Sequence, residues 1–361
     1  LGPIMNVDEI NSAIQGLVDE YGIPTFDVPN TTSEGSGGKG GMAGPVNHDA
    51  YHVYFTAGVH ARERGGPDNL IYFIADLLFA QKHSIGLTYG SKTYANADVI
   101  RALNTGIVFF ALVNPDGVRY DQKTDSLWRK NRNPADATPG NDATIGVDIN
   151  RNYDFLWDFR RHFHPAATVA TSLASDKPVV ETYHGPHAFS EAETRNVAWV
   201  FDQFQRVRWY MDIHSAAGDI LFNWGDDDDQ FGDPSMQFLN AAWDGKRGIV
   251  GDTPYREWID EGDFGKVSNA SNRVARAMQT VGGRTYRSLQ AVGLYPTSGA
   301  SDDYAYSRYR ADARRNKVHG FTMEFGYPTN FSPPLAEYHA NLKDTGAGLM
   351  EFCLAASDAG L

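Results

Sequence analysis

Cysteine is almost missing from the sequence, since Cys353 is the single cysteine among 361 residues. A disulfide bond within the chain is therefore excluded. Long apolar runs are missing as well, because no stretch reaches the roughly 18 consecutive apolar residues that a membrane-spanning helix needs. Positive charge is scarce, with 32 Lys and Arg against 45 Asp and Glu, which makes a net charge of −13. This balance argues against nucleic acid as the main partner, because phosphate contacts require a basic surface.

The remaining composition is that of an ordinary globular protein, with 42% hydrophobic and 21% charged residues. A chain of this length buries a large core without disulfide bonds. We find no internal repeat, no linker and no change in composition along the chain. We therefore expect a single domain over residues 1–361. We also expect a monomer, because no long exposed apolar face stands out.

Apolar strands and amphipathic helices alternate along the chain, which is typical of an α/β fold. Buried strands are predicted over residues 51–57, 107–113, 209–213 and 321–323, and helices over residues 6–21, 266–281 and 333–355. A further helix is predicted after Ser190, which forms a capping-box pattern with Glu193, as Asn6 does with Glu9. The Gly-rich residues 33–44 are predicted to form a flexible loop.

Metal-ligating side chains follow the first of these strands. His60 and Glu63 come after residues 51–57, and an imidazole with a carboxylate suits Zn²⁺. This pair alone is a weak signal, because a surface histidine beside a solvated glutamate would look the same. His214 ends another buried strand and could supply a third ligand, although it could also be a core histidine. Two histidines and one carboxylate would leave a fourth position for water, as in hydrolytic zinc sites.

Glu324 ends the last apolar strand. There it could act as the general base that takes a proton from a metal-bound water. The alternative is a salt bridge with one of the nearby arginines. Because open α/β sheets place their ligands beyond the carboxyl ends of their strands, we expect Glu324 to lie near His60, Glu63 and His214.

Together these residues resemble the zinc carboxypeptidases of the pancreatic carboxypeptidase A/B type, which also occur in bacteria. Seven motifs follow one another in the family's order: His60-Ala61-Arg62-Glu63, Asn114-Pro115-Asp116-Gly117, Trp128-Arg129-Lys130-Asn131-Arg132, Val147-Asp148-Ile149-Asn150-Arg151-Asn152, Asp212-Ile213-His214-Ser215, Tyr295 to Asp303, and Phe321-Thr322-Met323-Glu324. Seven motifs in one order are far more specific than any one of them. The resemblance covers nearly the whole chain and implies a mixed, mostly parallel central sheet with helices on both faces.

The resemblance also implies roles for individual residues in the chemistry. By similarity, His60, Glu63 and His214 bind one zinc ion, and Asp148 accepts the second ring proton of His60, which fixes its tautomer. Glu324 would activate the zinc-bound water and carry its proton to the leaving amine.

Other residues match the parts of the family that hold the substrate. Arg129 would stabilise the oxyanion of the tetrahedral intermediate. An exopeptidase must also bind a free C-terminal carboxylate, for which the planar guanidinium of arginine is suited. By similarity this falls to Arg151 with Asn150, while Tyr295 closes over the substrate and Arg62 lies further along the groove. The expected partners are the C-termini of peptides and proteins.

The residue seven positions after Tyr295 lines the floor of the family's specificity pocket. In the family an apolar residue there goes with aromatic or aliphatic C-terminal side chains, and an aspartate goes with Lys and Arg. Here it is Asp302, which resembles carboxypeptidase B. We expect a preference for C-terminal Lys or Arg, with a dual preference that includes hydrophobic residues as the compromise. The alternatives are that Arg308 pairs with Asp302, or that Asp303 changes the register.

Three further expectations complete the interpretation. The run Asp226–Asp229 is typical of a solvated loop, and a Ca²⁺ site there is the weaker alternative. Two other functions remain open: a zinc peptidase that cleaves bacterial cell-wall peptides, and a catalytically silent binding module, although such modules lose ligands or the base. The resemblance also suggests an extracellular or periplasmic location and a catalytic domain without a pro-segment.

Overall fold

An eight-stranded sheet forms the centre of the computed structural model, which describes residues 2–45, 47–326 and 330–361. In spatial order its strands are β1 (Thr25–Asp27), β2 (Lys39–Ala43), β6 (Ile107–Phe110), β3 (Val53–Ala57), β7 (Trp209–Ser215), β12 (His319–Phe325), β8 (Asp219–Phe222) and β11 (Arg287–Gln290). The pairs β6–β3, β3–β7, β7–β12 and β8–β11 are parallel, and the pairs β1–β2, β2–β6 and β12–β8 are antiparallel. The prediction of a mixed, mostly parallel sheet is confirmed.

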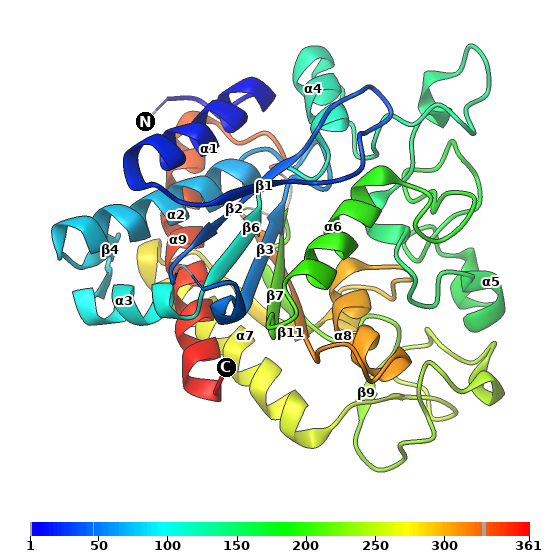
Figure 1. Ribbon diagram of the computed structural model, residues 1–361. Helices are drawn as coiled ribbons and strands as arrows, with labels where there is room; N and C mark the ends of the chain where they lie inside the picture. The colour runs from blue at the N-terminus through cyan, green and yellow to red at the C-terminus, as the bar shows by residue number, and fades with distance from the viewer. Residues whose placement is uncertain (1, 46, 327–329) are drawn as a thin grey trace.

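Helices cover both faces of this sheet (Figure 1). One face carries α1 (Val7–Tyr21), α2 (Gly66–His83), α3 (Asn96–Asn104), α7 (Glu261–Gly282) and α9 (Leu335–Ala359), and the other carries α6 (Ala192–Gln203) and α8 (Ser301–Ala311). The peripheral elements are α4 (Pro115–Thr124), α5 (Phe159–His162) and two small sheets, β4 (Leu87–Tyr89) with β5 (Lys92–Tyr94) and β9 (Asp229–Gln230) with β10 (Glu257–Trp258). Within the described residues, no helix is long and apolar enough to cross a membrane.

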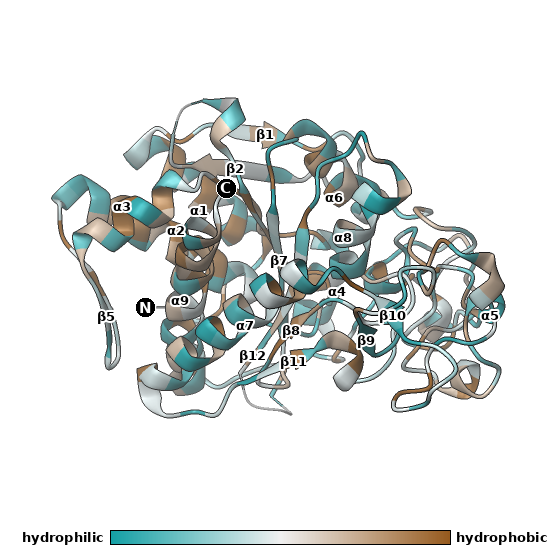
Figure 2. Ribbon diagram, turned by 90° about the horizontal axis from the view of Figure 1, so that it is seen from below, coloured by the Kyte–Doolittle hydropathy of each residue, from teal (hydrophilic) through white to brown (hydrophobic). Residues whose placement is uncertain are grey.

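Both faces of the sheet are buried, so its central strands are apolar without interruption. In β3 the side chain of Phe55 points to one face, where its ring lies 5.7 Å from that of Phe352 in α9. The neighbouring Tyr54 points to the other face, with its ring 5.0 Å from that of Phe201 in α6. In Figure 2, hydrophobic stretches alternate with hydrophilic ones along α2 and α9, two of the helices that pack on this sheet. Cys353 lies in α9 and is fully buried in this core, and burial raises the pKa of its thiol.

The two predicted capping boxes have different outcomes. At α1 the Asn6 side chain accepts hydrogen bonds from the backbone of Asp8 and Glu9, and the Glu9 carboxylate accepts one from the Asn6 backbone. At α6 the prediction is wrong. The helix begins at Ala192, so its N-cap residue is Glu191 and not Ser190. Ser190 instead donates to Glu191 at 2.7 Å, and the Glu193 carboxylate accepts a hydrogen bond from Asn131.

The Gly-rich segment 33–44 is not all loop, because β2 lies within it and the prediction is wrong there. The glycines permit a close approach of aromatic rings to this strand. A Cβ atom on Gly40 would lie 2.1 Å from the ring of Phe26, and one on Gly41 would lie 2.5 Å from the ring of Phe109. The glycine content suggested flexibility, but the lack of side chains on Gly40 and Gly41 allows aromatic rings to pack directly against the strand.

The carboxyl ends of β3, β7 and β12 meet at one edge of the sheet. In the parallel register His214 of β7 lies opposite Glu324 of β12, and Ile213 lies opposite Ala57 of β3. The connection from β3 to α2 leaves the sheet at this edge and carries His60 and Glu63. Residues separated by more than 260 positions in the chain are thereby brought to one place.

Candidate metal centre and active-site crevice

Three ligand-type side chains meet at this edge of the sheet. The Nδ1 atom of His60 lies 2.8 Å from Glu63 Oε1, and the Nδ1 atom of His214 lies 2.9 Å from Glu63 Oε2. The two Nδ1 atoms are 3.0 Å apart, and all three residues are buried. Among the described residues, this is the one group of His, Cys, Asp or Glu side chains found close enough together to hold a metal ion.

The donor set fits zinc. Two neutral imidazole nitrogens and a carboxylate are a common protein ligand set for catalytic zinc, with a fourth position left for water or substrate. Ligand atoms about 2.0–2.1 Å from a tetrahedral zinc ion lie about 3.3 Å from one another. The observed separations of 2.8–3.0 Å between His60, Glu63 and His214 are close to this value.

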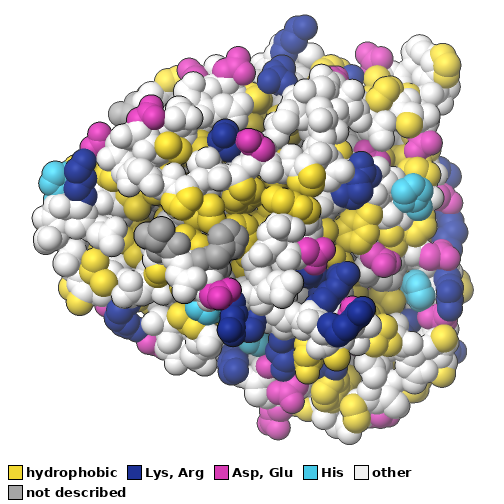
Figure 3. All heavy atoms as spheres, viewed as in Figure 1, with side chains coloured by type: hydrophobic (Ala, Val, Ile, Leu, Met, Phe, Trp, Pro, Cys, Tyr) yellow, Lys and Arg dark blue, Asp and Glu magenta, His cyan; other side chains and the backbone are white. Residues whose placement is uncertain are grey.

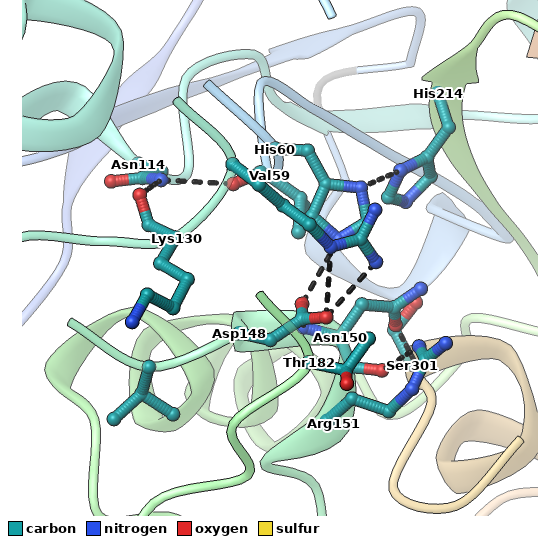
Figure 4. A network of polar contacts seen from close by, with 12 residues as sticks. Val59, His60, Asn114, Lys130, Asp148, Asn150, Arg151, Thr182, His214 and Ser301 are labelled. Atoms are coloured by element: carbon teal, nitrogen blue, oxygen red, sulfur yellow. Dashed lines mark hydrogen bonds and ion pairs between the residues drawn. The ribbon is translucent and has the colours of Figure 1, made fainter. Parts of the chain in front are cut away.

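The outward-facing nitrogens of both imidazole rings have carboxylate neighbours. Asp148 Oδ1 lies 3.0 Å from His60 Nε2, and Asp212 Oδ2 lies 2.9 Å from His214 Nε2. Figure 4 shows the His60 ring lying between His214 on one side and Asp148 on the other. A carboxylate at the second nitrogen holds the ring proton there, which leaves Nδ1 as the metal-facing atom.

The carboxylates of Asp148 and Glu63 are held as anions despite their burial. Burial alone would raise the pKa of Asp148, but the positive charge of Arg129 and the partner His60 hold it well below its usual range. Burial likewise opposes ionisation of Glu63, yet His60 and His214 lower its pKa. At this side of the crevice, neighbouring arginine and histidine side chains therefore outweigh desolvation in setting the direction of the pKa shifts.

The family resemblance implies a role for Asp148 but none for Asp212. The carboxylate of Asp212 accepts hydrogen bonds from Thr56 at 2.7 Å and Ser301 at 2.8 Å, in addition to facing His214. The alternation of side chains along a β-strand could have pointed to Asp212, because residues 212 and 214 of one strand lie on the same face.

Arg129 and Glu324 lie beside the metal-ligating triad. The Nε atom of Arg129 donates to Asp148 at 2.9 Å, and its Nη1 atom lies 4.0 Å from Glu63 Oε1. Glu324 is half-buried in β12, in register with His214. Burial and the nearby negative charge of Glu63 raise the pKa of Glu324 to about 8.

A crevice with a volume of about 240 Å³ opens in front of these groups. Its lining includes every predicted site residue except His214 and Asp148, which lie behind it: His60, Arg62, Glu63, Arg129, Asn150, Arg151, Tyr295, Asp302 and Glu324. The structure therefore brings all the predicted residues together around one space.

The arginine expected to bind a carboxylate is fixed in place by backbone groups. Arg151 donates from Nη1 to the Asn150 carbonyl and from Nη2 to the Ser172 carbonyl, both at 2.7 Å. The Asn150 side-chain oxygen accepts a hydrogen bond from the Ser301 backbone at 2.8 Å. The side-chain amide N–H groups of Asn150 remain as donors beside the Arg151 guanidinium.

Asp302 lies in the wall of the crevice, 3% exposed, at the start of α8. Its carboxylate accepts hydrogen bonds from Thr322 Oγ1 at 3.0 Å and from the Asp303 backbone at 2.9 Å. Burial raises the pKa of Asp302. Arg308 does not pair with it, because the Arg308 guanidinium forms its ion pair with Asp202. No cation contacts Asp302 in the part of the chain that the structure describes.

At the rim of the crevice Arg62 has two partners that sequence analysis did not identify. Its Nη1 atom lies 2.8 Å from Glu181 Oε1, and its guanidinium lies 4.7 Å from the centre of the Phe331 ring. These contacts join segments more than 100 residues apart, and no local pattern points to them.

Three of the four consecutive aspartates accept hydrogen bonds from separate partners. Asp227 accepts from the Gly248 backbone at 2.7 Å, Asp228 accepts from the Gly251 backbone, and Asp229 accepts from Gln290. Asp226 is fully buried, and both its carboxylate oxygens lack a hydrogen-bond partner among the described residues. The expectation of a solvated loop is therefore wrong for Asp226 and Asp227, which are buried against the loop that follows them.

Comparison with known proteins agrees with this geometry. A family model described as zinc carboxypeptidase matches residues 36–347. The chain belongs to the zinc carboxypeptidase family. It is therefore a metallocarboxypeptidase, a hydrolase that acts on C-terminal peptide bonds.

Individual relatives come from several animals. A carboxypeptidase B from Astacus astacus is 28% identical over 331 residues, which cover 88% of each chain. A carboxypeptidase A4 from Mus musculus is 25% identical over 277 residues, which cover 75% of this chain but 52% of that relative. The solved carboxypeptidase A from Helicoverpa armigera shares the fold, with a TM-score of 0.68 at 20% identity over 99% of this chain and 73% of that one.

Proposed function

We propose that this metallocarboxypeptidase removes C-terminal Lys or Arg residues from peptides and proteins. The observation that carries the proposal is the buried Asp302 carboxylate, which lines the same crevice as Arg151 and the metal-ligating residues His60 and Glu63. Removing a carboxylate from water costs several kcal/mol unless a cation compensates it, and a Lys or Arg side chain of the substrate would supply that cation.

Zinc is the metal that the triad would hold, through His60, Glu63 and His214. When bound, it would polarise the scissile carbonyl and lower the pKa of a water molecule. Asp148 and Asp212 would keep the two imidazole rings oriented, because each faces the nitrogen opposite the metal side.

Glu324 is the proposed general base. It lies in register with His214 and lines the crevice, so its carboxylate can take a proton from the attacking water. The same carboxyl group would return that proton to the leaving amine. Arg129, held by Asp148, would face the oxygen that gains negative charge in the transition state.

The free C-terminal carboxylate of the substrate would bind to Arg151 and Asn150. Arg151 is 2% exposed and anchored by two carbonyls, so it offers a preorganised cation at the crevice wall. Tyr295 also lines the crevice, where its hydroxyl would donate to the same carboxylate. Arg62 at the rim would contact the peptide on the amino side of the scissile bond.

The test compares release of C-terminal Arg and C-terminal Phe from otherwise identical N-blocked dipeptides. Chelator-sensitive release of Arg well above Phe is the expected result. Release of Phe that equals or exceeds that of Arg would contradict the role of Asp302 but leave the carboxypeptidase activity intact. Release of neither residue, with cleavage of cell-wall peptides, would overturn the proposal in favour of that substrate class.

A further inference from the structure

A second cavity, with a volume of about 450 Å³, lies at the edge of the sheet opposite the crevice. Its lining comes from the end of α6, from the segments that lead into β7 and β12, and from α8. β7 and β12 begin here and end at the crevice, and strands of seven residues span about 20 Å. The two cavities are therefore separate. We call this one the basic cavity, because Arg208, Arg308, Arg314 and Arg315 line it together with the single acidic residue Asp202.

Arg308 is the most buried of the four arginines that line the basic cavity and is 2% exposed. Its Nη2 atom donates to Asp202, and its guanidinium lies 4.9 Å from the centre of the Phe201 ring. The Nε and Nη1 atoms of Arg308 are buried and have no hydrogen-bond partner among the described residues. A buried guanidinium with unused donors carries a desolvation cost that one exposed carboxylate compensates only in part.

Positive charge exceeds negative charge around the basic cavity. Four arginines line it against Asp202, and of these Arg314 also pairs with Asp312 at 2.8 Å. Burial and the charge of the neighbouring Arg206 lower the pKa of Arg208. Figure 3 shows Lys and Arg side chains gathered in the lower middle of this face, the region of α8 in Figure 1. In a chain with a net charge of −13, such a concentration of arginine is a local exception.

We propose that the basic cavity binds a small molecule that carries a phosphate or sulfate group. Guanidinium groups bind these oxyanions through paired hydrogen bonds, and arginines from three separate segments can surround one tetrahedral group. A doubly charged anion balances the two positive charges that remain after Asp202 and Asp312 are counted against the four arginines. The volume lies within the range of small-molecule sites and leaves room for an organic portion beside the Phe201 ring.

The first experiment titrates the metal-loaded protein with inorganic phosphate and inorganic sulfate and follows the heat of binding. Saturable binding is expected, and Arg208→Gln and Arg315→Gln should each weaken it about tenfold. Arg208 and Arg315 are suitable positions because both are partly or fully exposed, whereas changing the buried Arg308 would also disturb the core. Absence of saturable binding for both anions would overturn the proposal.

Two control variants separate the basic cavity from other cationic sites. Arg276→Gln removes an exposed arginine on α7, and Arg151→Gln removes one of the three arginines that line the crevice. Both should bind phosphate as the unmodified protein does. If Arg151→Gln abolished binding while Arg208→Gln and Arg315→Gln left it unchanged, the anion would bind in the crevice and the proposal would be wrong.

A further titration distinguishes a free anion from a phosphate ester. Glycerol 3-phosphate is compared with inorganic phosphate under the same conditions. Tighter binding of the ester, lost in Arg315→Gln, would support a ligand with an organic portion. Binding of inorganic phosphate alone would restrict the proposal to the free anion, because the remaining volume would then make no contribution.

Discussion

Buried carboxylates on the two sides of the crevice have opposite electrostatic environments. On the metal side, Glu63 and Asp148 face imidazole rings and Arg129, and their pKa values are lowered although both are buried. On the pocket side, Asp302 has hydrogen-bond donors but no cation, and burial raises its pKa. Further from the crevice, Asp226 is also buried, with Arg247 Nε 4.0 Å from its carboxylate, and burial and the charge of Glu257 raise its pKa. Burial is common to all four carboxylates, so the balance of positive and negative neighbours decides the direction of each pKa shift.

This difference separates two uses of a buried acid. A carboxylate with a fixed positive partner stays an anion and can orient a ring or hold a metal. A carboxylate without one is poised to accept a cation or a proton from outside, as we propose for Asp302 and Glu324. For the first kind of carboxylate, folding itself supplies the positive partner. For the second kind, the charge is compensated only when a ligand or a proton binds.

Of the substitutions that test this comparison, Glu324→Gln is expected to have the largest effect. It keeps the shape of the side chain but removes the proposed proton acceptor. We expect kcat/KM to fall by about 10²–10⁴-fold, the usual contribution of a general base. Zinc content and binding of an uncleaved peptide should remain unchanged, because Glu324 is not a proposed ligand. Activity near that of the unmodified enzyme would show that the base lies elsewhere.

Asp302→Leu is expected to have the next largest effect, because it removes the unpaired charge from the pocket side. Release of C-terminal Arg should fall by about 10²-fold, the scale of losing one partner of a buried charge pair, while release of Phe should rise. Steady-state kinetics on matched dipeptides measures both. If Arg and Phe release fell equally, the substitution would have disturbed the crevice rather than its selectivity.

On the metal side, Asp148→Asn should lower zinc affinity by about 10–100-fold, as loss of an outer carboxylate usually does. The His60 ring would lose the acceptor for its Nε2 proton, and Arg129 would lose its ion-pair partner. Competition with a chelator of known affinity measures the change. Unaltered zinc affinity would mean that the ring is held by other contacts.

The smallest expected effect concerns Asp226→Asn and the pH dependence of stability. Burial and the neighbouring charge of Glu257 raise the pKa of Asp226 well above its ordinary value of 3.8. The folded protein therefore keeps a proton on Asp226 that the unfolded chain releases, so this stability is complete below about pH 3.8 and is lost as the pH rises towards the pKa of Asp226 in the folded protein. The variant should lose less stability than the unmodified protein between pH 5 and 8, by about 2 °C in Tm.

Thermal unfolding at both pH values checks this prediction. Asp19→Asn is the matched control, because Asp19 is an exposed carboxylate on α1. It should leave the pH dependence as it is. An equal change in both variants would show that the effect reports net charge rather than the Asp226–Glu257 pair.

The fold and most of the candidate site could be predicted from local signals. His214 and Glu324 end apolar strands, and parallel strands of one sheet present their carboxyl ends at one edge, so their proximity followed from the α/β pattern. The resemblance of the motifs then supplied the remaining residues, all of which the structure places at the crevice or directly behind it.

The errors share a physical cause, which is contact between distant segments. Gly40 and Gly41 were interpreted as loop because the rings of Phe26 and Phe109 that fill their space are not neighbours in sequence. Glu193 was expected to cap its own helix, but its carboxylate accepts a hydrogen bond from Asn131, 62 positions away. The alternative pairing of Arg308 with Asp302 is also decided by a distant contact, because Arg308 pairs with Asp202 of α6, 106 positions away.

The single thiol of the chain makes the protein its own reporter of unfolding. Cys353 in α9 is fully buried, and burial raises its pKa, so a thiol-modifying reagent finds no thiolate to attack in the folded state. Labelling requires α9 to separate from the helices packed on it, α2, α3 and α7, which exposes this part of the core. The rate of labelling would therefore measure how fast the core around Cys353 unfolds, with no engineered probe.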